Sequence, residues 1–113
     1  MAVLADDIGT LQEYAQGVMA RSEHHANTVG SIALALMGAI IWRADGGTIR
    51  IRKSGKGLAN MLWVDIAGRT YVFSYNHGQG TIEMKDRTQT GAVIHSFSNA
   101  TPVVDIETIF RTL

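Results

Sequence analysis

The sequence predicts a single α+β domain spanning residues 1–113. An N-terminal long or kinked helix packs on a curved, six-stranded antiparallel meander, and a short C-terminal helix follows. Three observations favour this fold. Apolar residues recur with helical spacing up to about residue 37, the pattern then alternates every second residue, and glycine-containing turns separate the alternating segments. A length of 113 residues fits one domain.

Composition narrows the classes of function. The 10 basic and 10 acidic side chains balance, so no general attraction to nucleic acid or to an anionic membrane is expected. The chain has no cysteine, which excludes disulfides and thiolate nucleophiles and fits a cytoplasmic location. The N-terminus lacks the basic region of a secretory signal, and the uncharged run at 29–42 is shorter than the ~20 residues of a membrane helix.

The first helical segment is expected over residues 11–37. Thr10 and Glu13 have the spacing of a capping box, in which each side chain accepts the other residue's backbone amide. A polar stretch at 21–27 interrupts the apolar face, so the segment is either one kinked helix or two helices. Its second half has the stronger apolar face, and we expect it to end near Gly38.

The period changes after Gly38, and six strands are expected from there on. Their predicted ranges are 39–44, 48–53, 58–66, 70–76, 81–87 and 92–98. Asp45-Gly46 is typical of a two-residue hairpin turn. This turn would place four apolar residues on one face: Ile40, Trp42, Ile49 and Ile51. The opposite face would hold Ile41, Arg43, Arg50 and Arg52.

The third and fourth strands form a second hairpin around Ala67-Gly68. A two-residue loop pairs Val64 with Tyr71 and Leu62 with Phe73, which defines an inner face of large side chains. After the fourth strand, alternation directs Ile82 and Met84 inward and Glu83 and Lys85 outward. Strands joined by short turns are expected to be neighbours, so the strand order is sequential.

Thr101-Pro102 predicts the start of the C-terminal helix, because threonine is a common N-cap and proline is favoured at the first helical position. The segment 103–113 has an amphipathic pattern. A final edge strand at 103–106 is the alternative.

The outer face of the predicted sheet carries an apolar set that we interpret as an oligomer interface. Its members are Ile41, Met61, Trp63 and Val72. Tryptophan and methionine are enriched in interfaces, and such a patch is seldom bare solvent surface. Either a second copy of the chain covers it, giving a homodimer, or the C-terminal helix folds over it through Ile109 and Phe110.

A ligand pocket is the second candidate site. The expected registers direct Asn60, Tyr75 and His95 inward at one end of the sheet, where they would bind or protonate a small molecule. The helix-plus-curved-sheet arrangement resembles the nuclear-transport-factor-2 and cystatin-like architecture, and this resemblance implies a cone-shaped pocket. No inward acid is evident to act as a base, so the favoured interpretation of His95 and Tyr75 is that they are hydrogen-bonded residues at the core boundary.

Basic residues around the first hairpin are the third candidate site. Arg43, Arg50, Arg52 and Lys56 would bind a phosphate or nucleic acid, although the segment lacks the glycine spacing of a P-loop. The alternative is a solvated strand face that discourages edge-to-edge aggregation. His24 and His25 are adjacent, so on a helix they point about 100° apart and are poorly placed to share one metal. No metal and no cofactor are therefore expected.

No motif in the sequence identifies a reaction. The favoured hypothesis is a non-catalytic protein that forms a homo-oligomer or binds a small ligand. A small enzyme using His95 and Tyr75 and a phosphate or nucleic-acid binder using Arg50 and Arg52 are the alternatives. The size of the chain, its missing cysteines and its lack of a signature resemble orphan proteins of mobile gene cassettes, which implies no particular activity.

Overall fold

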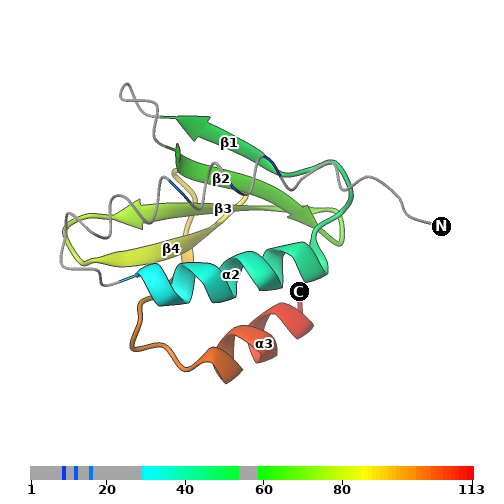
Figure 1. Cartoon of the computed structure of the whole chain (residues 1–113). Coiled ribbons are helices and arrows are strands. Elements are labelled where there is room, and N and C mark those ends of the chain that lie inside the picture. Colours follow the sequence, from blue (N-terminus) through cyan, green and yellow to red (C-terminus); the bar gives the residue numbers. More distant parts are fainter. Residues whose placement is uncertain (1–8, 10–11, 13–15, 17–28, 54–58) are drawn as a thin grey trace.

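A computed structural model describes residues 9, 12, 16, 29–53 and 59–113, without the side chains of residues 53, 59 and 60. The elements are α2 (Gly30–Arg43), β1 (Arg50–Lys53), β2 (Ala59–Ile66), β3 (Arg69–Asn76), β4 (Thr81–Asp86), β5 (Val93–Phe97) and α3 (Val103–Arg111). The strands form an antiparallel sheet in the order β1-β2-β3-β4-β5, with α2 and α3 on the same side of it (Figure 1). The fold is therefore α+β with an antiparallel sheet.

The predicted first strand is wrong, because residues 39–43 belong to α2 and the described residues form five strands instead of six. A glycine at position 38 weakens a helix by about 1 kcal/mol relative to alanine, which does not suffice to end it. Helical spacing brings Ile40 onto the buried side of α2 next to Leu36, and only 1% of Ile40 remains exposed. Burial of Ile40 thus overrides the strand propensity of the Ile40-Ile41 pair.

The predicted faces of the first hairpin are wrong for the same reason. Ile40 is buried against the sheet, whereas Trp42 is 49% exposed on the opposite side of α2. Ile41 likewise lies on α2 and not on the sheet. Ile51 does face inward, paired with Leu62, while Arg50 and Arg52 face outward opposite Trp63 and Met61.

Asp45 is not part of a hairpin turn. Its side chain instead links the α2–β1 loop to the turn between β2 and β3. Its carboxylate accepts hydrogen bonds from the backbone amides of Ala67 and Gly68, at 3.2 and 2.9 Å. These two residues form the turn between β2 and β3, with φ angles of 52° and 79°. Two such neighbouring amides make a small anion site, which the chain fills with its own carboxylate.

The second hairpin is confirmed. Val64 pairs with Tyr71 and Leu62 with Phe73 around the Ala67-Gly68 turn. The sequential strand order is also confirmed. The inward side chains of β2 to β5 meet the buried side of α2 in one core, and its largest fully buried strand residues are Leu62, Ile66, Phe73, Ile82, Met84 and Phe97.

The C-terminal helix is confirmed, and the alternative edge strand at 103–106 is not formed. Pro102 is the N-cap residue and not the first helical residue, so the helix begins one residue later than predicted. The Thr101 hydroxyl, the predicted cap, instead accepts a hydrogen bond from the Ser98 amide. Helix α3 packs beside α2, and Phe110 stacks on Phe73 with 6.2 Å between the ring centroids. Because Phe73 is on the inner face of the sheet, α3 does not cover Trp63 on the outer face.

Most of the predicted N-terminal helix lies outside the described residues, as does the choice between one kinked helix and two. The curvature of the sheet stays a prediction. Within the described part of the chain, no helix is long and apolar enough to cross a membrane.

Candidate functional site

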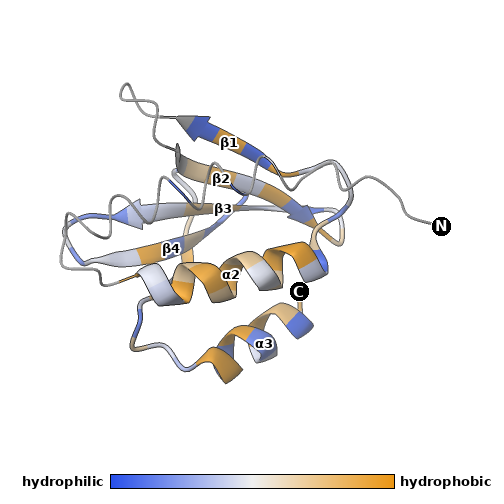
Figure 2. Cartoon of the chain, viewed as in Figure 1, coloured by the Kyte–Doolittle hydropathy of each residue, from blue (hydrophilic) through white to orange (hydrophobic). Residues whose placement is uncertain are grey.

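Helix α2 is apolar on both of its sides. Between Gly30 and Trp42 it carries no charged residue, and the hydropathy colouring shows apolar residues along its whole length (Figure 2). The side toward the sheet buries Ile32, Ala33, Leu36 and Ile40. On the opposite side Leu34 is 58% exposed and Ile41 is 54% exposed. A helix that is apolar all round is normally covered all round, so the exposed side is unusual for a protein surface.

A groove runs between the exposed side of α2 and the start of α3. It has a volume of about 240 Å³, and its lining consists of Ala35, Gly38, Ala39, Trp42, Val103, Ile106 and Glu107. Three of the lining residues on α2, Ala35, Gly38 and Ala39, are small, whereas Trp42 and Val103 are larger. Val103 is 70% exposed. The α2–α3 face is defined here as Leu34, Ala35, Gly38, Ile41, Trp42 and Val103.

Trp42 is held in place by two arginines. The guanidinium of Arg43 lies 5.7 Å and that of Arg111 5.2 Å from the centre of a Trp42 ring. Arg43 is itself fixed, because it donates hydrogen bonds to the backbone carbonyls of Phe110 and Leu113, the latter at 2.8 Å. Arg111 pairs with Glu107 one turn earlier. The indole is thus half exposed but restrained, which is a property of residues that anchor interfaces.

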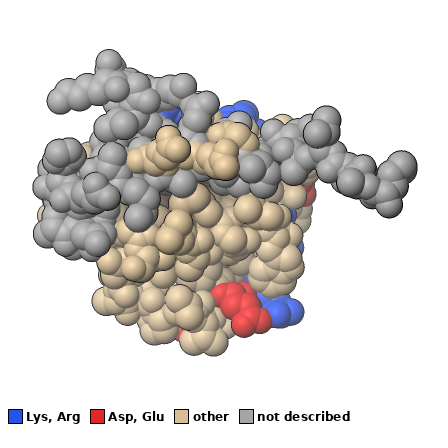
Figure 3. Space-filling model, viewed as in Figure 1, with Lys and Arg blue, Asp and Glu red and all other residues tan. Residues whose placement is uncertain are grey.

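Glu107 is the charged residue in the lining of the groove, and Arg43 and Arg111 lie beside Trp42 at the margin of the face. Seen from the helix side, the surface over α2 and α3 is almost entirely uncharged, with acidic and basic atoms together at one lower edge (Figure 3). Arg43 donates its hydrogen bonds to carbonyl groups at the end of α3, and its predicted role in anion binding stays a prediction.

Three of the four residues in the predicted oligomer interface lie together on the outer face of the sheet. Met61, Trp63 and Val72 lie on the side of the sheet away from the helices, with Trp63 paired to Val72. Ile41 lies on α2, so it does not belong to this patch. Val72 is 0% exposed and Trp63 is half-buried.

The chain covers this outer patch itself, through the loop between β4 and β5 (residues 87–91). Arg52 on β1 donates to the side chain of Gln89 at 3.0 Å, and Lys85 on β4 donates to the Gln89 carbonyl at 3.1 Å. Because β2 and β3 lie between β1 and β4, Gln89 lies over them. Arg52 also lies 6.0 Å from the Trp63 ring. Neither α3 nor a second chain is needed to bury Val72.

The shape of this loop depends on Arg87 and Gly91. Arg87 has a φ of 69°, a left-handed conformation that few non-glycine residues adopt. A Cβ atom at Gly91 would lie 2.0 Å from the Asp86 carbonyl oxygen, so only glycine fits. These two positions turn the loop back over the sheet.

The outward-facing arginines Arg50 and Arg52 form hydrogen bonds or ion pairs with neighbouring residues. Arg50 lies 3.3 Å from Asp65 and donates to the Thr48 carbonyl at 2.7 Å. The Thr70 hydroxyl donates to Asp65 at 2.7 Å, and this hydrogen bond, with a smaller contribution from Arg50, lowers the pKa of the Asp65 carboxyl. Lys56 lies outside the described residues. Among the described members of the predicted basic set, Arg43 lies on α2, whereas Arg50 and Arg52 share the outer face of β1.

The predicted pocket residues lie on three different strands. Tyr75 is on β3 and His95 on β5, and the buried Ile82 and Met84 of β4 lie between their strands. Asn60 is on β2 next to β3, but its side chain is outside the described part. The hydroxyl of Tyr75 is buried without a hydrogen-bond partner in the described structure. Tyr75 and His95 therefore lie on strands that β4 separates, and a ligand shared between them stays a prediction.

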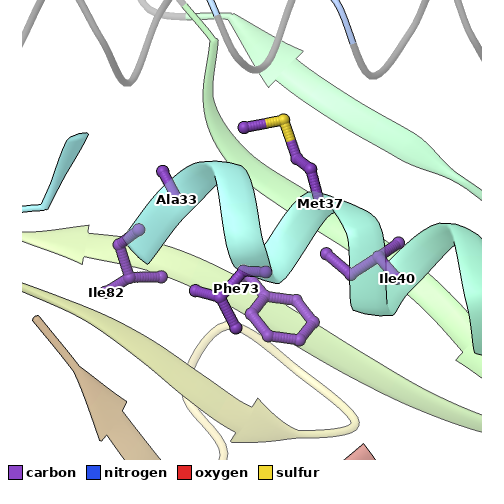
Figure 4. A pocket seen from close by; sticks show the side chains of 6 residues that line it. Ala33, Met37, Ile40, Phe73 and Ile82 are labelled. Atoms are coloured by element: carbon purple, nitrogen blue, oxygen red, sulfur yellow. The ribbon is translucent and has the colours of Figure 1, made fainter. Parts of the chain in front are cut away.

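The space beneath α2 is an apolar gap. Ala33, Met37 and Ile40 of α2 line it from one side, and Phe73 and Ile82 of the sheet from the other (Figure 4). It has no room for a water molecule and its lining includes none of the three predicted pocket residues. Among the described residues, no group of three or more histidine, aspartate or glutamate side chains is placed to hold a metal ion.

Sequence reasoning missed Leu34, Trp42 and Val103. The signal was present, because Leu34, Gly38, Ile41 and Trp42 share one helical stripe once the helix is continued past Gly38. A helix predicted to end near Gly38 places Ile41 and Trp42 in a strand, so these residues are no longer recognised as one exposed helical face with Leu34.

The chain matches a known protein family. Residues 11–107 match the family model described as "Integron cassette protein VCH_CASS1 chain". The match covers most of the chain, and the description names no activity. A comparison with curated proteins gives no match.

Proposed function

We propose a non-catalytic function for this chain, which belongs to the family of the integron cassette protein VCH_CASS1 chain: it is an interaction protein that forms a homodimer through its α2–α3 face. One observation carries the proposal. Half or more of Leu34, Ile41 and Val103 and nearly half of Trp42 are exposed on an uncharged surface, although each is a large apolar side chain.

The exposed apolar area is large enough to form the centre of an interface. The exposed parts of these four side chains amount to roughly 400 Å², about half of the ~800 Å² that each partner contributes to a standard interface. A second copy would supply an equal patch, so the apolar centre of an interface is already present. Restrained Trp42 at this centre fits the tendency of tryptophan to dominate binding energy.

Light scattering at roughly 0.1 mM protein tests the proposal, because a dimer with a micromolar Kd is then nearly complete. We expect twice the monomer mass for the natural chain and the monomer mass for Trp42→Glu. The matched control is Ile94→Glu, since Ile94 is 40% exposed on β5, outside the α2–α3 face. This control should remain dimeric, whereas a monomeric natural chain would contradict the proposal.

A small apolar ligand is the second candidate, because the groove between α2 and α3 offers about 240 Å³ of space with largely apolar walls. Titration with the dye anilinonaphthalene sulfonate in dilute protein tests it. We expect a gain of dye fluorescence that Ala35→Leu abolishes by filling the groove. Equal fluorescence from both proteins would exclude the groove as the site.

The remaining predictions have less support. The separation of Tyr75 and His95 gives no support to a catalytic pocket. Arg50 and Arg52 already have hydrogen-bond partners, so they give little support to nucleic-acid binding. The cytoplasmic location is likewise a proposal, supported by the absence of cysteine.

A further inference from the structure

The groove between α2 and α3 lies inside the proposed dimer surface. Four of its lining residues belong to the α2–α3 face, namely Ala35, Gly38, Trp42 and Val103. Gly38 is exposed, and Trp42 and Val103 are 49% and 70% exposed, so the groove opens to solvent at this face. A second copy that buries Trp42 and Val103 therefore also closes the mouth of the groove.

A closed groove of this size is destabilising if it stays empty. Its volume is about 240 Å³, and its lining is apolar except for Glu107. An empty apolar cavity weakens an interface in proportion to its volume, because the atoms around it lose their packing partners. A dimer that is stable without a ligand thus places its own side chains in the groove, and these occupy the space that a small molecule would need.

The lining and the rim of the groove favour a flat apolar ring that carries an anionic group. A cavity of about 150 Å³ accepts one benzene ring, so about 240 Å³ suits a bicyclic ring. The Trp42 indole lines the groove and offers aromatic contact to such a ring. Beside Trp42 lie the guanidiniums of Arg43 and Arg111, at 5.7 and 5.2 Å from the ring centre. The carboxylate of Glu107 balances one of these two cations, which leaves one positive charge in excess.

Arg111 is the cation that is able to turn toward a bound anion. Its side chain is 63% exposed, and its pair with Glu107 joins neighbouring turns of α3 at the surface, where such pairs contribute little to stability. Arg43, in contrast, is held by the backbone carbonyls of Phe110 and Leu113. An anionic group at the rim therefore gains Arg111 as a partner while the apolar ring lies in the groove.

We propose that a small aromatic anion binds in this groove in competition with the second copy, so that the ligand controls dimerisation. The inference rests on the proposed function and adds its regulation. Because binding free energies are linked, a ligand that excludes the second copy is excluded by it to the same extent. The ligand shifts the chain toward the monomer, and a high protein concentration releases the ligand.

Sedimentation velocity with 2-naphthoate as the probe tests the competition. The Kd of naphthoate for the monomer is first measured in dilute protein by fluorescence anisotropy. At about ten times this Kd, each chain contributes a factor of about 11, so the Kd of the dimer should rise on the order of 100-fold. An unchanged or lower dimer Kd, or no binding of naphthoate at millimolar concentration, would overturn the inference and leave the proposed function standing. A natural chain that is monomeric without naphthoate would contradict the proposed function itself.

The neutral analogue 2-naphthalenemethanol tests the anionic part of the ligand. It has the same ring system without a charge, so several-fold more of it should be needed for the same rise in the dimer Kd. Arg111→Gln should remove this difference, whereas the matched control Arg50→Gln, on the outer face of β1, should keep it. Equal effects of the two compounds on the natural chain would overturn the assignment of an anion.

Ala35→Leu imitates a permanent occupant of the groove. The larger side chain fills the space that the second copy and naphthoate both need, so the dimer Kd should rise on the order of 10-fold or more and no longer respond to naphthoate. Ile94→Leu, on β5 outside the α2–α3 face, is the matched control and should keep both the natural Kd and its response. An Ala35→Leu dimer that still dissociates with naphthoate would place the ligand elsewhere and overturn the inference.

Circular dichroism verifies that each variant is folded. Ala35 is partly exposed and leucine is a strong helix former, so α2 should persist in Ala35→Leu. If this variant loses its helical signal, Gly38→Leu takes its place, because Gly38 also lines the groove and a Cβ atom there meets nothing within 4 Å. The same rise in dimer Kd and the same loss of response to naphthoate are expected, and a natural response in Gly38→Leu would equally overturn the inference.

Discussion

Val72 and Leu34 are both aliphatic residues outside the main helix–sheet core, yet Val72 is 0% exposed and Leu34 is 58% exposed. Over Val72 the chain supplies its own cover, from the paired Trp63 and Lys85 and from Gln89 in the β4–β5 loop. No described residue provides such a cover over Leu34. Hydropathy alone therefore does not identify an interaction surface, because an apolar patch stays exposed only where no other part of the same chain covers it.

The largest contrast is expected when a charge is placed at each position. Val72→Asp buries a carboxylate without a partner and should lower the free energy of unfolding by about 3 kcal/mol or more. Leu34→Asp places the same group in water and should change it by less than about 0.5 kcal/mol in dilute protein. Urea unfolding of both variants measures the difference. Similar losses at the two sites would show that Leu34 is covered after all.

The two tryptophans report separately on the two faces, since Trp42 lies on the α2–α3 face and Trp63 on the outer face of the sheet. In Trp63→Phe, which keeps only Trp42, we expect the emission maximum to move to shorter wavelength by about 5–10 nm as the dimer forms and covers the ring. In Trp42→Phe, emission should not depend on protein concentration. A concentration dependence confined to Trp63 would reverse the assignment of the interface.

The β4–β5 loop is expected to contribute a smaller amount. Gln89→Ala removes the acceptor of the Arg52 hydrogen bond and should cost about 0.5–1.5 kcal/mol of unfolding free energy. It should also make Trp63 easier to quench with acrylamide, because the loop above it loosens. Thr90→Ala is the control, since Thr90 is an exposed residue of the same loop that has no bond to Arg52 or Lys85. Equal quenching in both variants would mean that Gln89 does not hold the loop down.

The smallest effect concerns the Asp65 carboxyl on the outer face. Its pKa is lowered mainly by the hydrogen bond from Thr70, and Arg50 adds to this. A lowered pKa in the folded state means that the stabilisation is complete above the unfolded pKa, near pH 4, and is lost as the pH falls through the folded value. The contribution should be below about 1 kcal/mol, as for other exposed pairs.

An NMR titration of Asp65 sharpens this prediction. Thr70→Val should raise the pKa of the carboxyl more than Arg50→Ala does, because the threonine bond is the larger cause. A larger shift in Arg50→Ala would instead make the ion pair dominant. In both variants the decrease in unfolding free energy below about pH 4 should become shallower.

The second hairpin shows how much local pattern alone predicts. The dipeptide Ala67-Gly68 and the alternation on each side of it suffice to pair Val64 with Tyr71, because a one-residue slip would expose every inward side chain. The inward placement of Ile82 and Met84 follows from the same alternation. The start of α3 after Pro102 was predicted by turn chemistry within one residue.

The candidate site was less predictable, and the reason lies at Gly38. Two isoleucines and a tryptophan after a glycine fit a strand as well as a helix over so short a run, and periodicity does not separate them. The choice depends on whether Ile40 finds a core beside Leu36, which is a property of the assembled sheet. Once that choice was wrong, Ile41 was assigned to the outer face and Trp42 to the core.

The sequence by itself determined the α+β class, the order and register of the central strands, the C-terminal helix and the outward position of Met61, Trp63 and Val72, because each depends on the spacing of neighbouring residues. Only the tertiary structure decided that α2 continues to Arg43, that Asp45 holds the β2–β3 turn, and that Gln89 covers the outer face while the α2–α3 face stays open. The Asp45 contacts and the Arg52–Gln89 hydrogen bond join residues 22 or more positions apart, and the end of α2 depends on burial against distant strands, so no local periodicity records them.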